Sequence, residues 1–489
     1  MVPLDDAAWS PGIPKISILS IILIPSLAVI LGLYRLFFHP LASIPGPFFA
    51  KFTAFWYVYR SYRGDVTSHV RKLHRKHGNV VRVGPNTVDI ADGAVLGPIY
   101  VERGGFMKTS DYHKFYFDGY ATIFSTSDPA YRATRAKAVA SLFSVAAIRR
   151  ERSLISTCVE RFVHRLQQSR TTSGGRPVDL QEPARLLGFE VVNAYLFRRE
   201  YPHRVDGTSE KSIIPWLNAF VDAGQLFYFS ERWFAFFLPR LERWRPQRDL
   251  ERKSAESVHE FALNLPTSVP DGNEKSDSYQ GRLHQHGIPR DQVAAECKDV
   301  LFAGVHSFGA LLGTTLWYLA RDTAIHDRLQ NEISEHRGLE VDMQQLPYLS
   351  SVVKEGFRLA PVNTQLPRVV PPGGWHFDEH YFPSGTVVGV SSPQLFLNPE
   401  VYPDPMAFRP ERWEKASNEM HRDLIPFSLG IRQCIARNLA MAELFMAVKQ
   451  VAESDVLRGA EPLEDMIETY DWFNTAVKGN RIDLVWAEK

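Results

Sequence analysis

The sequence predicts a mainly α-helical protein: one large helical bundle with a small β-rich region, preceded by an N-terminal transmembrane helix. Three observations support this fold class. An uncharged apolar run lies near the start of the chain, helical patterns occupy most of the remaining sequence, and β-like runs are confined to residues 79–92 and 365–390.

The composition bounds the class of protein before any motif is considered. The 489 residues are 45% hydrophobic and 23% charged, which is enough apolar material for one large enzyme domain. The 56 basic and 55 acidic residues nearly cancel, so the overall charge does not favour nucleic acid as a partner. Three cysteines are too few for a disulfide framework, which indicates that most of the chain faces a reducing compartment.

Residues 16–34 carry no charge over 19 positions. As a helix rising about 1.5 Å per residue, this run roughly matches the hydrocarbon core of a bilayer. A cleavable signal peptide is the alternative, but the run is longer than a usual signal core and no small-residue cleavage site precedes Arg35. Asp5 and Asp6 precede the run and basic residues come after it, so we expect residues 1–15 in the lumen. The expected location is therefore the endoplasmic reticulum membrane, crossed once, with the catalytic domain cytosolic.

The segment 35–50 is predicted to be a proline-rich hinge. Pro40, Pro45 and Pro47 cannot continue the preceding helix, and they favour a stiff, extended backbone. No compositional break divides the remainder, so residues 51–489 are expected to form one catalytic domain.

The longest helix signal begins near Pro289 and continues to Asp322. Its middle is apolar on nearly every face, so it should cross the protein interior. Ala303, Gly304 and Gly309 leave room either for a flat ligand or for a closely packed helix, and the residues alone do not choose between the two.

A motif near the C-terminus carries the chemistry. Phe427, Gly430, Arg432 and Cys434 stand at the spacing F-x-x-G-x-R-x-C, directly before a strongly helical segment. Glycine permits a tight turn, and the helix N-terminus favours the thiolate form of the cysteine. An ordinary buried cysteine is the competing explanation, but it does not account for four matched positions ahead of a helix.

This motif resembles the heme-binding loop of cytochromes P450. The resemblance implies the P450 fold, a helical bundle around heme b, with Cys434 as the axial thiolate ligand to iron. It also implies that Arg432 reaches a heme propionate and that Phe427 shields the sulfur from water. Thiolate ligation favours O–O cleavage. The chain departs from the usual pattern at Ile431, where the family often has proline, and at Ala436, where it usually has glycine.

Other segments extend the resemblance along the chain. In the family's order, Glu355 and Arg358 of E-x-x-R precede FRPERW, which implies that Arg412 joins them in a buried, structural ion network. Arg135 in YRATR and Arg368 in LPRVVPPGG match positions that imply further propionate partners.

The resemblance is greatest to P450s of filamentous-fungal secondary metabolism. It implies a monooxygenase that inserts one oxygen atom from O2 into a lipophilic small molecule, with electrons supplied from NADPH by NADPH-cytochrome P450 reductase. The phenylalanine-rich segment 216–244, which the family places over the substrate channel, suits such a substrate, although core packing explains part of it.

The central helix departs from the family where protons are delivered to oxygen. The family usually reads A-G-x-acid-Thr, whereas this chain has Ala303, Gly304, Val305, His306 and Ser307. Our hypothesis is that His306 and Ser307 are catalytic and jointly relay protons, since an ordinary histidine titrates near neutrality. A histidine that only lines the pocket or lies in the core is the alternative. A register on Thr314 and Thr315 fits the residues beyond them less well.

Two other functions could be inferred from the same residues. A serine hydrolase using His306 and Ser307 is excluded, because neighbouring residues of a helix do not face each other and the elbow G-x-S-x-G is absent. A heme-thiolate protein that does not activate O2, such as a hydroperoxide-rearranging enzyme or a gas sensor, shares the motifs. Dependence of turnover on electrons separates it from a monooxygenase.

Overall fold

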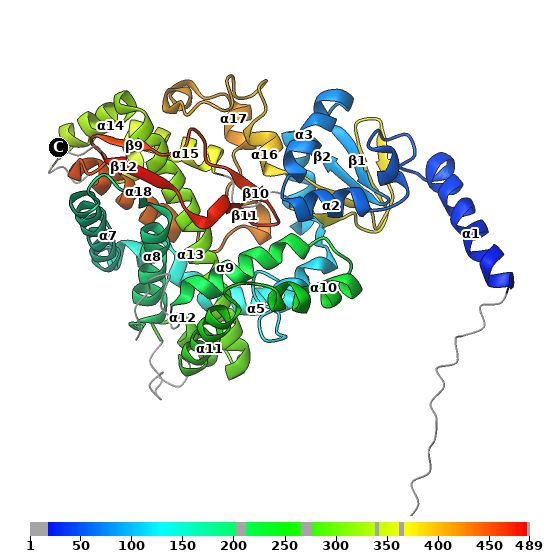
Figure 1. The fold of residues 1–489 in the computed structure, drawn as a ribbon, viewed down its shortest axis with the longest axis horizontal. Coiled ribbons are helices and arrows are strands. Elements are labelled where there is room, and N and C mark those ends of the chain that lie inside the picture. The colour runs from blue at the N-terminus through cyan, green and yellow to red at the C-terminus, as the bar shows by residue number, and fades with distance from the viewer. Residues whose placement is uncertain (1–17, 202–211, 266–275, 338–341, 361–365, 487–489) are drawn as a thin grey trace, which may run out of the picture.

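A computed structural model describes residues 18–201, 212–265, 276–337, 342–360 and 366–486. The described chain is mostly helical, as the sequence predicts (Figure 1). Its α-helices are α1 (Ile18–Leu33), α2 (Phe55–Arg63), α3 (Val66–His77), α4 (Leu96–Tyr100), α5 (Pro129–Val139), α6 (Val145–Arg150), α7 (Arg152–Thr172), α8 (Gln181–Val191), α9 (Ile213–Ala223), α10 (Glu231–Arg243), α11 (Arg248–Asn264), α12 (Tyr279–Gln285), α13 (Arg290–Arg321), α14 (Thr323–Glu335), α15 (Pro347–Leu359), α16 (Ser392–Phe396), α17 (Asn418–Asp423) and α18 (Arg437–Ser454).

The strands are short and form four small sheets. They are β1 (Val80–Gly84), β2 (Thr87–Ile90), β3 (Met107–Lys108), β4 (Val178–Asp179), β5 (Arg368–Val369), β6 (Trp375–Phe377), β7 (His380–Phe382), β8 (Val387–Gly389), β9 (Ala460–Pro462), β10 (Thr469–Asp471), β11 (Thr475–Val477) and β12 (Asp483–Trp486). The largest sheet has the order β1-β2-β8-β5-β3, with β2 and β8 parallel and the other neighbours antiparallel.

The prediction that strands are confined to two segments is wrong. Strands β3 and β4 and the whole C-terminal group β9 to β12 lie outside those segments. Each has only two to four residues, and several pair with a distant part of the chain, as β12 does with β4. Runs this short carry almost no period-2 pattern, so sequence reasoning could not see them.

Helix α13 runs through the middle of the globule and is buried along most of its length (Figure 1). Among the described residues it is the one helix with the length and mean hydropathy to cross a membrane, but 78% of its apolar window is buried by protein. Its glycines serve close packing in part: a Cβ on Gly309 would lie 2.4 Å from Cγ of Arg185 in α8. Likewise, a Cβ on Gly188 of α8 would lie 2.4 Å from the Gly304 carbonyl oxygen. The two helices therefore touch backbone to backbone.

Helix α1 extends away from the globule beside the five-stranded sheet (Figure 1). Its 16 residues include exposed Leu27, Val29 and Ile30. The predicted lumenal segment 1–15 and the start of the predicted anchor lie outside the described residues. Within the described part of the chain, the apolar stretch at this end is Ser26–Phe38, which is shorter than a membrane span.

The predicted hinge is not a free extended linker. Its first residues continue α1 as a π-helix, Tyr34–Phe38, and the residues after it are bound to strand β1. The backbone N–H of Arg82 donates to Pro45 O (2.7 Å), and its guanidinium donates to Leu41 O (3.0 Å). Leu41 and Ile44 are fully buried. The prolines prevent a continuous helix, but burial fixes the segment in place.

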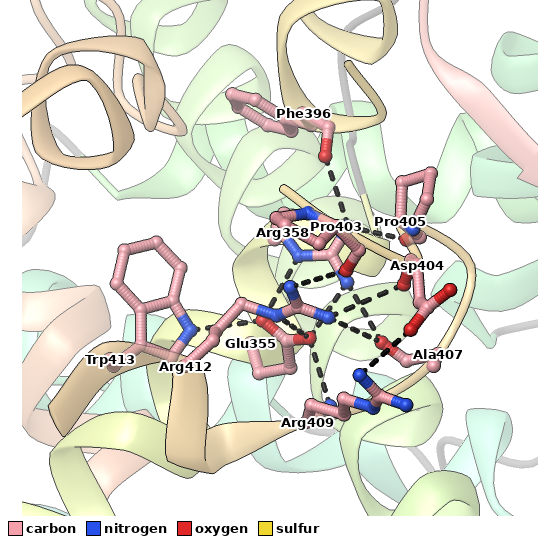
Figure 2. Close-up of polar contacts among 10 residues, drawn as sticks. All are labelled: Glu355, Arg358, Phe396, Pro403, Asp404, Pro405, Ala407, Arg409, Arg412 and Trp413. Atoms are coloured by element: carbon pink, nitrogen blue, oxygen red, sulfur yellow. Dashed lines mark hydrogen bonds and ion pairs between the residues drawn. The ribbon is translucent and has the colours of Figure 1, made fainter. Parts of the chain in front are cut away.

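A buried ion network connects α15 to the segment before α17 (Figure 2). Glu355 accepts two hydrogen bonds from Arg358, at 2.7 and 3.0 Å, and one from Arg412 at 3.0 Å. Trp413 Nε1 (2.9 Å) and the backbone N–H of Arg409 (2.9 Å) also donate to this carboxylate. The structure thus brings together the three residues that the resemblance groups, and adds two donors that it does not imply.

The remaining donors of the two arginines bind backbone carbonyls. Arg358 donates to Phe396 O and Ala407 O, and Arg412 donates to Pro403 O. Both side chains of the Glu355–Arg358 pair are completely buried. A buried pair is favourable only when its other hydrogen-bonding groups are satisfied, which is the case here. The network fixes the loop 396–413 against α15.

Candidate cofactor site

A cavity of about 310 Å³ lies between α13 and the loop that precedes α18. Helix α13 contributes one stripe of residues at helical spacing. They are Asp299, Val300, Phe302, Ala303, Gly304, Ser307, Phe308 and Leu311. The opposite wall comes from the loop of residues 425–436, which contains the F-x-x-G-x-R-x-C motif. A flat group placed here would have α13 on one face and the cysteine loop on the other.

Cys434 lies at the wall of this cavity, three residues before α18 begins. Its side chain is deep in the molecule but is open toward the cavity. Burial raises the pKa of its thiol, while the backbone N–H of Ala436, which donates to sulfur, lowers it. Ala436 has an ordinary negative φ of −90°, so alanine fits where the family usually has glycine. A sulfur with an N–H donor at a helix start is suited to bind a metal as the thiolate.

Gly430 makes the turn that directs the cysteine inward. Its φ is +66°, and a Cβ there would lie 2.1 Å from the backbone oxygen of Tyr100. No other residue fits both conditions. The turn is closed by the N–H of Cys434, which donates to Phe427 O at 2.9 Å. The Phe427 ring packs edge-on against Phe357, with centroids 5.1 Å apart, and lines the cavity beside the sulfur.

Four cationic side chains line the same cavity: Lys108, Arg132, Arg368 and Arg432. Lys108 and Arg368 stand directly opposite each other in the antiparallel pair β3–β5. Within the described part of the chain, none of the four forms an ion pair with a carboxylate. Like charges facing each other across strands are unfavourable unless an anion lies between them.

Burial and the neighbouring positive charges lower the pKa values of two of these side chains. Burial, followed by the charges of Arg132 and Arg368, lowers the pKa of Arg432 to about 10. Burial, followed by Arg368 and Arg432, lowers the pKa of Lys108 well below its usual value. A ligand with two carboxylates would place negative charge beside Arg432 and Lys108 and so offset the repulsion that lowers their pKa values. The cluster therefore fits the two propionates of heme, and the residues present fit that cofactor.

The structure does not bring Arg135 to the cavity. Its Nε lies 3.4 Å from a carboxylate oxygen of Glu296, and its guanidinium donates to Gln292. Arg132, three residues earlier in the same motif, lines the cavity instead. Residues three apart lie only about 60° apart around a helix, so the two arginines of YRATR share one broad face of α5, and the motif alone did not show which of them reaches the cavity.

The structure also places His306 outside the cavity. His306 lies off the α13 stripe, is completely buried, and its Nε2 is 3.0 Å from the backbone oxygen of Thr475 in β11. Burial, with the nearby charge of Arg185, lowers the pKa of His306 to about 3, so it stays neutral. Ser307 does line the cavity. The described geometry therefore gives no support to His306 as a relay group, and the relay remains a hypothesis carried by Ser307.

Sequence reasoning missed Lys108, Arg132 and Asp299. Lys108 lies on a two-residue strand that carries no pattern, and only its pairing with Arg368 shows its direction. Arg132 was visible in YRATR, but it lies on the same broad face of the helix as Arg135, and nothing in the motif favoured it. Asp299 lies two helical turns before Ser307. This spacing places it near the cavity only once the face of α13 that lines the cavity is known.

Comparison with known proteins supports this assignment. The family model for cytochrome P450 matches residues 44–453. The cytochrome P450 monooxygenase mfmF of Annulohypoxylon moriforme is 34% identical, over 95% of this chain and 99% of the relative. The cytochrome P450 monooxygenase ORF9 of Penicillium roqueforti is 27% identical, over 90% and 86%. Pisatin demethylase of Fusarium vanettenii is 25% identical, over 86% of each. With its cysteine loop, cation cluster and central helix in place, the chain belongs to the cytochrome P450 family and is a monooxygenase-type oxidoreductase.

Proposed function

We propose that this chain binds heme b through Cys434 and inserts one oxygen atom from O2 into a lipophilic small molecule. The observation that carries the proposal is the cavity itself, which joins an inward-facing cysteine to four cations without ion pairs among the described residues. Electrons come from NADPH through NADPH-cytochrome P450 reductase. The substrate is an intermediate of secondary metabolism, which the fungal relatives support.

Each group of residues has a definable task. Bound heme supplies the redox chemistry that activates O2. Cys434 holds the metal, and Arg132, Arg368, Arg432 and Lys108 hold the propionates by charge-assisted hydrogen bonds. Ser307 presents the one hydroxyl of the α13 stripe to the cavity, and its Oγ holds and passes a proton.

We further propose that α1 anchors the protein in the endoplasmic reticulum membrane, with the globule in the cytosol. Support comes from the apolar surface of α1 and from exposed aromatic side chains near it, Phe48, Phe49 and Phe55. Exposed Trp233 and Phe236 on α10 offer further apolar contact with a bilayer.

Coexpression with a reductase tests the reaction class. We expect NADPH-dependent oxidation of a lipophilic substrate, with incorporation of one atom of ¹⁸O from ¹⁸O2. Turnover of a hydroperoxide without electrons, and without any NADPH-dependent product, would instead favour a rearranging enzyme.

The proton task of Ser307 has its own test. Ser307→Ala should form more hydrogen peroxide per NADPH consumed while retaining its heme. His306→Gln is the matched control, because His306 lies next in sequence but does not line the cavity. Equal coupling in both variants would remove Ser307 from the mechanism.

A further inference from the structure

The α13 stripe contains one ionisable side chain, Asp299. It lies two helical turns before Ser307, about 12 Å along the helix axis, among apolar neighbours such as Ile123, Val300 and Phe302. A carboxylate in an apolar wall is costly unless it has partners, so its retention in the cavity needs an explanation.

Part of the explanation is structural. The Asp299 carboxylate accepts hydrogen bonds from the Thr122 side chain and the Phe124 backbone N–H, and Lys108 lies close enough to interact with it. Burial raises its pKa to about 6, and these three groups hold it from rising further. The group is therefore ionised at neutral pH, and it tethers the segment 122–124 to α13.

Tethering alone does not require a cavity-facing group. Glu296, one turn earlier, tethers the same segment by accepting the Ile123 N–H at 3.0 and 3.1 Å, and Glu296 does not line the cavity. A carboxylate has about four lone-pair sites, and the protein's hydrogen bonds to Asp299 use two of them. Asp299 thus retains acceptor capacity in the wall of the cavity.

The net charge of the cavity indicates which kind of hydrogen-bond donor on a ligand Asp299 would accept. With heme bound, Lys108, Arg132, Arg368 and Arg432 would bring four positive charges, against which heme would bring two carboxylates and Asp299 a third negative charge. The other lining carboxyl group, Glu443, does not add to this sum, because burial raises its pKa well above its usual value and favours the neutral form. A positive balance already remains, so a protonated amine would add an unfavourable charge. A neutral donor leaves the balance unchanged and still gains a hydrogen bond to an ionised acceptor.

We propose that Asp299 determines specificity by accepting a hydrogen bond from a hydroxyl group on the lipophilic substrate. This proposal rests on the proposed function. The substrate then reaches the enzyme already oxygenated, so the preceding step is of a class that leaves a free hydroxyl, such as carbonyl reduction or an earlier hydroxylation. A buried acceptor of this kind discriminates strongly against an analogue that lacks the donor.

Binding of a matched pair of small probes tests the proposal. Cyclohexanol and methylcyclohexane have nearly the same shape and differ in the hydroxyl. Their dissociation constants are measured on the heme-loaded enzyme by displacement in the Soret spectrum, and paramagnetic relaxation of the probe protons by the iron establishes that each lies in the cavity. The quantity of interest is the ratio of the two constants, compared between enzyme variants.

We expect Asp299→Leu to shift this ratio against cyclohexanol by about tenfold or more, and Asp299→Asn to shift it less, because the amide oxygen still accepts. Glu296→Gln is the matched control, since it weakens the same tether without facing the cavity, and it should leave the ratio unchanged. An unchanged ratio in Asp299→Leu, an equal shift in Glu296→Gln, or the absence of relaxation for cyclohexanol would overturn the proposal. Intact heme loading and the thiolate-type spectrum in every variant keep such a failure separate from a failure of the proposed function.

Discussion

Cys434 differs from the other two cysteines in its surroundings. Cys158 and Cys297 are buried among apolar side chains of the core, whereas Cys434 opens toward a cavity and accepts the Ala436 N–H. Position near a helix start and contact with open space, rather than burial as such, separate a metal-binding thiol from a packing residue.

Replacing the sulfur tests this assignment directly. Cys434→Ser should lose the thiolate-type absorption of the reduced carbonyl complex, because a hydroxyl cannot replace a soft anionic donor. Cys297→Ser is the control and should keep the spectrum, since Cys297 does not line the cavity. A thiolate-type spectrum that persists in Cys434→Ser would show that another residue binds the iron.

Gly430 should tolerate no side chain. Gly430→Ala places a Cβ against the Tyr100 carbonyl oxygen at a positive φ, so we expect a loss of about 2 kcal/mol or more in the free energy of unfolding, together with weaker heme retention. Gly373→Ala separates the two causes, since Gly373 also has a positive φ, +97°, but open space around it. Chemical denaturation and heme-transfer rates measure both effects. Equal losses in the two variants would show that the Tyr100 contact is unimportant.

The buried His306 should make the protein sensitive to acid. Its folded-state pKa of about 3 lies below the unfolded value of 6.5, so the unfolded state binds the proton first as pH falls. The contribution of neutral His306 to the free energy of unfolding is therefore present above pH 6.5 and is lost progressively as the pH falls toward 3. Between pH 6.5 and 5, this amounts to roughly 2 kcal/mol.

His306→Gln keeps a donor for the Thr475 carbonyl but cannot titrate. Its free energy of unfolding should therefore fall less between pH 6.5 and 5 than that of the unaltered protein. The exposed His164, replaced in the same way, is the control and should leave the pH profile as it was. Parallel pH profiles for His306→Gln and the unaltered protein would contradict the assigned burial.

At the scale of elements, α15 and the segment after α16 depend on one carboxylate. Glu355→Gln leaves the fully buried Arg358 and the partly buried Arg412 without their anion, which should cost about 3–5 kcal/mol and reduce heme content on purification. Glu419 stands at the same spacing from Arg422 but is exposed, so Glu419→Gln should have no measurable effect. Thermal unfolding and the ratio of Soret to protein absorbance distinguish the two variants. A Glu355→Gln protein of normal stability would show that the network is dispensable.

Helices with a long sequence pattern were predictable, but which of their side chains face the cavity was not. The sequence indicated α13 from Pro289 onward, yet it could not tell that the stripe of Asp299, Ala303 and Ser307 faces the cavity while His306 faces β11. An apolar helix buried on all sides has little amphipathic signal from which to read a direction. On α5 the limit is different: Arg132 and Arg135 are three residues apart on one face, so their spacing could not separate them.

At the scale of the whole molecule, the globule begins inside the segment predicted as a hinge, at the buried residues Leu41 and Ile44. Removal of residues 1–38 should leave a folded protein that binds heme, because the motifs and the docked residues Leu41 and Ile44 remain. Removal of residues 1–46 should lower the thermal midpoint, since the buried Arg82 then loses the carbonyls of Leu41 and Pro45. Heme content and thermal unfolding of both truncations measure this difference. Equal stability of the two would show that the hinge is not part of the fold.

The family, the cysteine loop and the order of motifs were predictable from sequence, and the family model and relatives confirm the membership. These features are local in the chain. The cation cluster and the carboxylate Asp299 arise from pairing between distant segments, such as Lys108 with Arg368, and only the folded chain brings them together.

The C-terminal strands have a consequence for how the protein folds. Asn474 lines the cavity, β11 contacts His306, and β12 pairs with β4, so these parts of the fold depend on contacts between segments far apart in the sequence. Such contacts form slowly, because a long stretch of chain must first be brought together at its two ends. The cofactor should therefore be captured late in refolding, after β12 has paired with β4.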